Sequence, residues 1–183
     1  MGKVLYVANF PPETDEETLR ALFAEHGEVV SFTVEQDERA QQPYALVEMH
    51  SEKQTTRAMN KLNGYELGGR RLAVSPAYPE LSKDITARQR KTAAEIIATL
   101  EEEDKVPVRQ IEAIVRFCGG QFARAILQEA LEIDAGEGIP TSDGSRRRTK
   151  GGVFFYLARY RMSPAVRKIV YNRKGKVPGE KYD

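Results

Sequence analysis

The sequence predicts an α+β chain, with an N-terminal domain of order βαββαβ followed by a small all-α domain. Two observations support this prediction. Residues 1–78 mix short runs of period two with amphipathic segments of period 3.6, whereas residues 89–172 show only the helical period. We expect a linker at 79–88, beginning at Pro79. Residues 173–183 are predicted to form a basic, flexible tail.

Four β-rich runs and two helical runs make up the first domain. Strands are expected at residues 4–8, 29–34, 44–49 and 71–75. The first helix should begin at a capping box formed by Thr14 and Glu17 and end at Gly27. The second helix should span residues 51–62. This order is that of a ferredoxin-like split βαβ fold, whose four strands form one antiparallel sheet.

Two of these strands carry aromatic side chains on one predicted face. Alternation places Tyr6 on the face opposite to Leu5 and Val7, and it gives Tyr44 and Leu46 a common face. A strand tyrosine can simply be half-buried, so the alternation by itself does not establish a binding site.

The sequences of these two strands resemble a known family. Leu5–Phe10 resembles the first short signature of the RNA recognition motif, and Gln42–Met49 resembles the second. In that family, aromatic side chains on the open sheet face stack on two or three bases. The resemblance implies that RNA contacts come from Tyr6, Asn9, Tyr44 and Leu46.

The second signature departs from the family pattern at three positions. Gln42 stands where a basic residue is usual, Pro43 where a glycine is usual, and Leu46 where a third aromatic is usual. Fewer rings and fewer charges weaken base stacking and phosphate attraction. We therefore expect weak or permissive RNA binding by this sheet. A recognition-motif fold that contacts protein instead is the alternative.

The second domain shows five helical segments. They are expected around residues 86–100, 107–118, 122–131, 153–158 and 164–170. Pro107 suits a first helical position. Cys118 continues the apolar stripe of its helix, so we interpret it as a core residue and not as a nucleophile. The acidic run 101–104 is interpreted as a solvated helix end and not as a metal site.

Charge is distributed unevenly along the chain. Residues 141–183 hold twelve Lys/Arg and three Asp/Glu, a net charge of +9, whereas residues 1–140 hold 16 basic and 24 acidic residues, a net charge of −8. Such a split indicates an anionic partner for the C-terminal part, most commonly a nucleic acid. A basic tail that only maintains solubility is the alternative.

Four of these basic residues lie within five positions, Arg146–Lys150, in the run Gly144–Phe154 before an apolar helix. Basic side chains combined with free amides at a helix start can hold phosphate, although an ordinary exposed basic loop has the same composition. Together with Ile111–Gly119, this run resembles the RNA-binding domain of the phosphorylated adaptor for RNA export, a small helical unit that binds single-stranded RNA. The resemblance covers about residues 90–162. It implies RNA contacts by Arg146, Arg147, Arg148 and Thr149, and we add Lys150, which fills the variable position of the motif.

These observations predict a non-enzymatic, two-module protein that binds single-stranded RNA. A protein-interaction adaptor that uses a degenerate recognition motif is the main alternative. An RNA-cleaving enzyme is a third, but there is no phosphate-binding loop motif, and His26 and His50 are interpreted as surface residues. We expect no metal and no small-molecule cofactor.

The composition also indicates a location for the protein. A single cysteine suits a reducing compartment. No apolar run approaches the length of a membrane span and no signal peptide is recognised, so we expect a cytoplasmic protein without a membrane partner.

Overall fold

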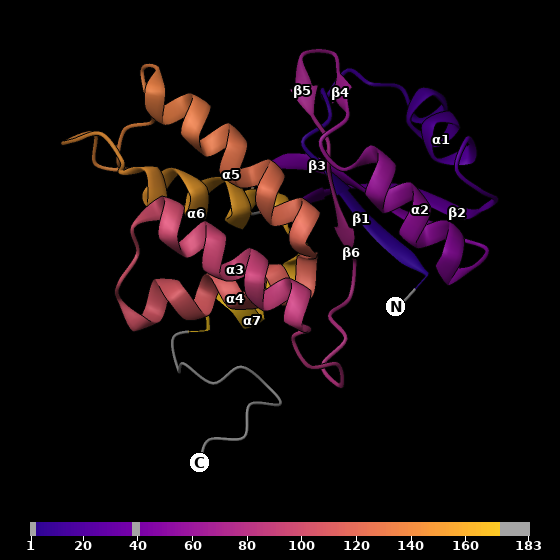
Figure 1. The fold of residues 1–183 in the computed structure, drawn as a ribbon. Helices are drawn as coiled ribbons and strands as arrows, with labels where there is room; N and C mark the ends of the chain where they lie inside the picture. The colour runs from indigo at the N-terminus through magenta and orange to yellow at the C-terminus, as the bar shows by residue number, and fades with distance from the viewer. Residues whose placement is uncertain (1–2, 38–40, 173–183) are drawn as a thin grey trace. The chain divides into compact units, whose positions relative to one another are not determined.

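The computed structural model describes residues 3–37 and 41–172 (Figure 1). The chain divides into two compact units. The sheet unit comprises residues 1–80 and Arg161–Arg167, and the helical unit comprises residues 81–160 and 168–183. The predicted basic tail at 173–183 lies outside the described residues.

The sheet unit contains the predicted βαββαβ order. Its elements are β1 (Val4–Ala8), α1 (Glu16–Ala24), β2 (Val29–Asp37), β3 (Gln42–Met49), α2 (Glu52–Leu62) and β6 (Ala73–Pro76). The four strands form one sheet in the order β2-β3-β1-β6, with every neighbouring pair antiparallel. A small hairpin, β4 (Glu66–Leu67) and β5 (Arg70–Arg71), precedes β6 and was not predicted. The predicted ferredoxin-like fold is thereby confirmed.

The predicted start of α1 was wrong. Its N-cap is Asp15, whose carboxylate accepts a hydrogen bond from the Thr18 N–H at 3.0 Å. The Thr14 N–H instead donates to the Pro11 carbonyl at 2.9 Å, so Thr14 belongs to the preceding turn. Ser51 caps α2 in the same way, accepting from the Gln54 N–H at 3.4 Å.

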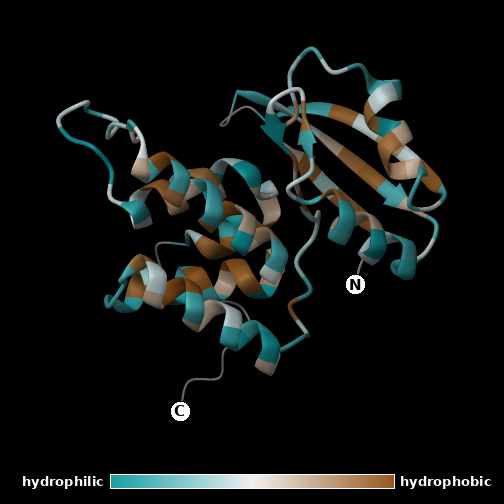
Figure 2. Ribbon diagram, turned by 45° about the horizontal axis from the view of Figure 1, so that its top comes forward, coloured by the Kyte–Doolittle hydropathy of each residue, from teal (hydrophilic) through white to brown (hydrophobic). Residues whose placement is uncertain are grey.

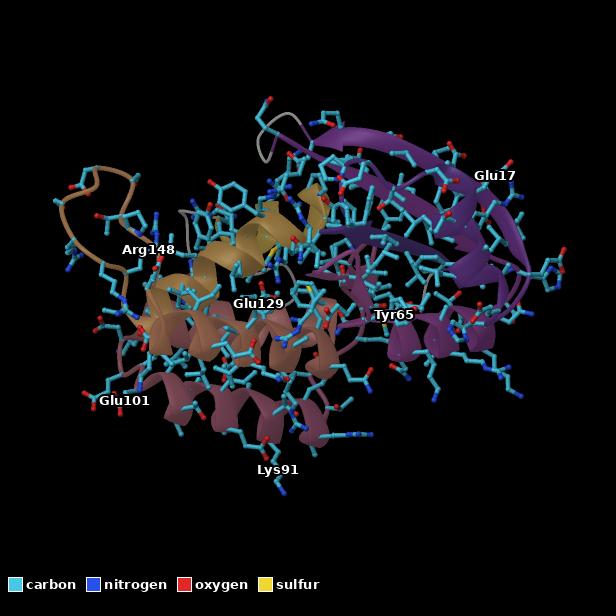
Figure 3. The ribbon with its side chains drawn as sticks, turned by 90° about the horizontal axis from the view of Figure 1, so that it is seen from above. Glu17, Tyr65, Lys91, Glu101, Glu129 and Arg148 are labelled. Atoms are coloured by element: carbon cyan, nitrogen blue, oxygen red, sulfur yellow. The ribbon has the colours of Figure 1, made fainter. Side chains whose placement is uncertain are left out.

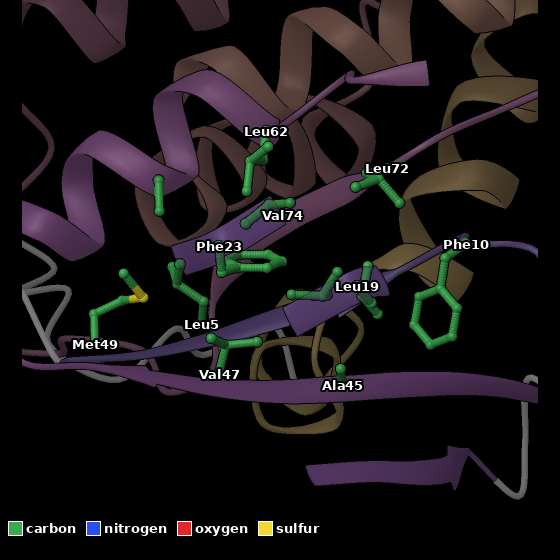
Figure 4. Close-up of a cluster of buried hydrophobic side chains, with 12 residues drawn as sticks. Leu5, Phe10, Leu19, Phe23, Ala45, Val47, Met49, Leu62, Leu72 and Val74 are labelled. Carbon is green, nitrogen blue, oxygen red and sulfur yellow. The ribbon is translucent and has the colours of Figure 1, made fainter. Parts of the chain in front are cut away.

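The core of the sheet unit lies on the face of the sheet covered by α1 and α2 (Figure 4). Register places Leu5 opposite Val47 and Val7 opposite Ala45, so one face of β1 and β3 is apolar. Both helices contribute large apolar side chains to this face. The buried cluster consists of Leu5, Val7, Phe10, Leu19, Phe23, Ala45, Val47, Met49, Ala58, Leu62, Leu72 and Val74.

The five predicted helices of the second domain are all present. They are α3 (Ala87–Leu100), α4 (Lys105–Cys118), α5 (Gly120–Ala135), α6 (Lys150–Arg161) and α7 (Pro164–Val170). Each of the first four presents buried apolar residues, among them Ile96, Ile114, Phe122 and Phe154. Figure 2 shows apolar residues along these helices and a hydrophilic loop between α5 and α6. No helix in the described ranges is long and apolar enough to cross a membrane.

Several helix starts differ from the prediction, including that of α5, which begins at Gly120 and not at Phe122. α4 begins at Lys105, so Pro107 stands within its first turn, where a missing N–H leaves no intrahelical bond unmade. α6 begins at Lys150, three residues earlier than predicted, with the helix capped by Thr149. Cys118 is buried, as predicted, and burial raises the pKa of its thiol.

Candidate nucleic-acid interface

The face of the sheet opposite α1 and α2 brings the two predicted tyrosines together. Register places Tyr6 between Leu46 on β3 and Ser75 on β6. The rings of Tyr6 and Tyr44 stack with centroids 5.0 Å apart and an interplanar angle of 28°. This arrangement follows from the alternation of both strands and gives the face an aromatic centre.

The polar residues on this face are acidic. The same register that holds Tyr44 puts Glu35 opposite it, with Asp37 and Glu48 in line on the same side. The four strands contain no Lys or Arg. The Tyr44 hydroxyl donates a hydrogen bond to the Glu35 carboxylate, which, with burial, raises the pKa of Tyr44 to about 12. The strands by themselves therefore offer stacking rings but no phosphate contacts.

Tyr6 is closed to solvent in this conformation. Its relative exposure is 1 %, and Asp37 and Arg167 beside it are 6 % and 8 % exposed. Arg167 Nη2 donates a hydrogen bond to Asp37 Oδ2. Burial raises the pKa of the Tyr6 hydroxyl, the negative charge of Asp37 raises it further, and the positive charge of Arg167 opposes both. A base cannot stack on Tyr6 while this arrangement persists, whereas Tyr44 and Leu46 remain only half-buried.

Asn9, the remaining predicted residue of the sheet, has a local structural role. Its backbone is left-handed, with φ of 63°, a conformation that asparagine tolerates better than most residues. Its side-chain amide donates to the Arg71 carbonyl at 2.8 Å. Asn9 thereby fixes the end of β1 to the β5 strand.

The second candidate surface is the loop between α5 and α6, residues 136–149, which we call the arginine loop. Its backbone closes on itself through Thr141 N–H to Arg146 O at 2.8 Å and Arg148 N–H to Ile139 O at 2.9 Å. Asp143 accepts hydrogen bonds from the Thr141 and Ser145 hydroxyls, which lower the pKa of its carboxyl to about 2. The loop is therefore a closed, hydrogen-bonded turn.

The three arginines of the loop differ in their surroundings. Arg146 is exposed. Arg147 donates to the Asp134 carbonyl, forms an ion pair of 3.6 Å with the Asp134 carboxylate, and lies across Gly138. Gly138 has φ of 73°, a backbone conformation that favours glycine, and a Cβ there would also displace the Arg147 side chain, whose Nε would lie 2.0 Å away.

Arg148 connects the loop to a pair of tyrosines on α6. Its Nε donates to the Pro140 carbonyl at 3.1 Å, and its guanidinium carbon lies 5.0 Å from the centroid of the Tyr156 ring. The rings of Tyr156 and Tyr160 meet edge to face at 4.9 Å. The sequence prediction did not include these tyrosines, although their i, i+4 spacing on the helix that follows the basic run was a signal that could have indicated them.

The start of α6 is already occupied by the protein's own groups. Thr149 Oγ1 accepts from the Gly152 N–H at 3.1 Å, and Lys150 Nζ lies 2.9 Å from Glu101 Oε2. A Cβ on Gly151 would lie 2.0 Å from Glu102 Oε1, so this carboxylate lies against the first turn, where a helix favours negative charge. Figure 3 shows Glu101 and Arg148 at this end of the helical unit. The predicted free amides are therefore not simply available to phosphate.

A four-stranded sheet with stacked tyrosines and a helical unit with a basic loop define a protein of the RNA-binding class. Residues 5–73 match the RNA recognition motif, and residues 92–176 match the RNA-binding domain of phosphorylated adapter RNA export protein. The chain belongs to the RNA recognition motif family and carries this second RNA-binding domain after it.

Several known proteins are similar to part of this chain. RbpA of Nostoc sp. is 39% identical over 77 residues, which cover 41% of this chain and 76% of RbpA. The human cleavage stimulation factor subunit 2 tau variant is 38% identical over 82 residues, 44% of this chain and only 13% of that protein. A structure of the Rna15 recognition motif with bound RNA (GU) is 26% identical, with a TM-score of 0.38, and the match covers 50% of this chain and 96% of that one.

Proposed function

We propose that this protein binds single-stranded RNA in two places and catalyses no reaction. The observation that carries the proposal is the arginine loop, which presents three adjacent arginines on a closed backbone within the matched RNA-binding domain. Guanidinium groups on a fixed turn lose little conformational freedom when they pair with phosphates. In the proposal, Arg146, Arg147, Arg148, Thr149 and Lys150 face the RNA backbone.

Base stacking supplies the second kind of contact. Beside the loop, the Tyr156 ring is 36% exposed and is already aligned with the Arg148 guanidinium. On the sheet, Tyr6 and Tyr44 form the proposed stacking pair, Leu46 lies directly opposite Tyr6, and Asn9 follows the end of β1. Stacking on aromatic rings tolerates any base, which suits binding without strong sequence preference.

The loop is tested by replacing two of its arginines. Arg146→Ala combined with Arg147→Ala should weaken binding of a uridine-rich RNA at least tenfold at low salt. The slope of log affinity against log salt should also become shallower, by about 0.7 for each lost phosphate contact. Fluorescence anisotropy of a labelled oligomer at several salt concentrations measures both quantities.

The matched control is a pair of basic residues on α2, which covers the face of the sheet opposite to Tyr6 and Tyr44. Lys53 and Arg57 are exposed on α2, and changing both to alanine removes the same charge. This control should alter RNA affinity by less than about threefold, because it removes two positive charges that are not proposed to contact the RNA. Equal losses in the two double variants would show that net charge, and not the loop, drives binding.

A protein-interaction adaptor is the second candidate, and the acidic sheet face favours it. Glu35, Asp37 and Glu48 repel phosphate and attract cationic side chains. If the protein fails to bind oligomers of any composition, the adaptor function is preferred. If Tyr44→Ala weakens RNA binding, the sheet contributes to RNA recognition and the adaptor is not needed.

A further inference from the structure

A segment from the C-terminal part of the chain closes the sheet face over Tyr6. Arg161–Arg167, which we call the cover segment, belongs to this unit although it is far from the strands in sequence. Its residue Arg167 reaches Asp37 across 130 positions of the chain. The same arginine is an electrostatic neighbour of Tyr6. The cover segment therefore lies where a base would have to stack.

The charges of the segment and of the face are complementary. The segment carries two arginines, Arg161 and Arg167, both about 8% exposed, and the strands present Glu35, Asp37 and Glu48. An arginine placed against an acidic, partly aromatic face is a favourable arrangement. The attraction between these arginines and the acidic residues favours closure of the sheet face by the cover segment.

The closed arrangement leaves buried polar atoms without partners. Within the described ranges, Arg167 Nε and Ser75 Oγ have no hydrogen-bond partner. Ser75 stands directly opposite Tyr6 on β6, so both atoms belong to the same closed face. Burying a charge pair is costly unless every polar atom is satisfied. The Arg167–Asp37 ion pair therefore stabilises a closed state that the unmet hydrogen bonds of Arg167 Nε and Ser75 Oγ destabilise.

We propose that the cover segment and RNA compete for the sheet face, so that RNA reaches Tyr6 only after Arg167 leaves Asp37. This inference rests on the proposed function. When only a fraction of molecules is open, the apparent dissociation constant rises by the reciprocal of that fraction. Weakening the cover segment should therefore tighten RNA binding, which is the opposite of what loss of a positive charge does by itself.

Arg167→Glu tests the closure without RNA. The variant places a carboxylate against Asp37 and should expel the cover segment. Acetylation of tyrosine hydroxyls by N-acetylimidazole, mapped by mass spectrometry on the full chain, reports the result. We expect Tyr6 to be protected in the original protein and to react at least tenfold faster in Arg167→Glu, while Tyr78, which is 62% exposed, reacts equally in both.

Two further variants separate opening from misfolding. Arg167→Gln keeps much of the side chain and removes only its charge, so it should expose Tyr6 to a smaller degree. Combining Asp37→Arg with Arg167→Glu restores an ion pair of reversed sign and should restore protection of Tyr6. Persistent protection in both Arg167→Glu and Arg167→Gln, or a fully reactive Tyr6 in the original protein, would overturn the closure.

Competition is then measured with a uridine-rich RNA against a charge-matched control. Lys168 is the next residue of α7 and is exposed, so Lys168→Glu changes the net charge equally. We expect Arg167→Glu to bind RNA about tenfold more tightly than Lys168→Glu. This figure assumes that about nine-tenths of the original molecules are closed and that Arg167→Glu opens all of them. Adding Tyr44→Ala should abolish this gain.

The two ideas fail in different ways. Equal RNA affinities in Arg167→Glu and Lys168→Glu, with Tyr6 uncovered in the former, would overturn the competition but leave RNA binding by the arginine loop intact. Absence of RNA binding in every variant would overturn the proposed function and the competition together, while the acetylation result would still decide whether the sheet is closed.

Discussion

The sheet face and the arginine loop are proposed to bind the same polymer, yet their surfaces are opposite in kind. The sheet face has stacked rings among acidic side chains, and its central tyrosine is buried. The loop has three adjacent arginines on a turn closed by its own hydrogen bonds, with a ring at its base. The first surface can read bases but repels phosphate, and the second attracts phosphate.

This difference implies an order of events. In the proposed function, the loop would attract RNA over a distance, because charge acts at the range of the Debye length while stacking acts only in contact. Once one segment of RNA is held, the local concentration of its neighbouring nucleotides at the sheet rises. A closed sheet face would then favour RNA long enough to engage both surfaces.

The largest expected effect comes from removing the support of the loop. Phe154 on α6 is fully buried and packs edge to face on Phe155 at 5.4 Å. Phe154→Ala should lower the free energy of unfolding of the helical unit by about 3–5 kcal/mol. Urea denaturation followed by circular dichroism measures the loss. The control is Val106→Ala at a side chain that is 64% exposed, expected to change stability by less than about 0.5 kcal/mol. Similar losses in both would show that α6 is not part of a packed core.

The contribution of the sheet should depend on the state of the cover segment. Tyr44→Ala should weaken RNA binding less in the original protein, where Tyr6 is buried, than in the Arg167→Glu background, where the loss should be about 1–3 kcal/mol per unstacked base. A double-mutant cycle by fluorescence anisotropy measures this dependence. Equal effects of Tyr44→Ala in both backgrounds would mean that the sheet face is equally open in the original protein and in Arg167→Glu.

A smaller loss is expected at the ring beside the loop. Tyr156→Ala removes a stacking surface and the partner of the Arg148 guanidinium, and should weaken RNA binding by about 1 kcal/mol. An oligomer containing abasic positions, which cannot stack, should bind the original and the variant alike. Tyr65→Ala, at an exposed tyrosine of the sheet unit, serves as the control. A deficit that persists with the abasic oligomer would indicate that Tyr156 acts only on the loop structure.

The smallest effect concerns acid. Hydrogen bonds from Thr141 and Ser145 lower the pKa of Asp143 to about 2, below its ordinary value of 3.8. A lowered pKa means that the carboxylate favours the closed loop above about pH 4, and that this contribution is lost as the pH falls from about 4 to about 2. NMR titration of the Ser145 amide should show that midpoint near 2, and Asp143→Asn should abolish the transition. A midpoint near 4 would show that the hydrogen bonds do not form in solution.

Periodicity and capping chemistry were enough to predict most elements of both units. The alternation in β1 and β3 correctly separated Leu5 and Val47 from Tyr6 and Tyr44, because a strand turns successive side chains to opposite faces. Element boundaries were less accurate. Thr14 has the pattern of a cap, but Asp15 is the cap, because the Thr14 N–H is used by the preceding turn.

The local sequence determined that Tyr6 faces away from the helices and that the arginines follow one another before α6, since both depend only on neighbouring residues. Only the tertiary structure decided what meets these side chains. Arg167 reaches Asp37 beside Tyr6, and the Glu102 carboxylate lies against Gly151. Contacts of that kind join residues distant in the chain through electrostatics and packing, and no local pattern encodes them.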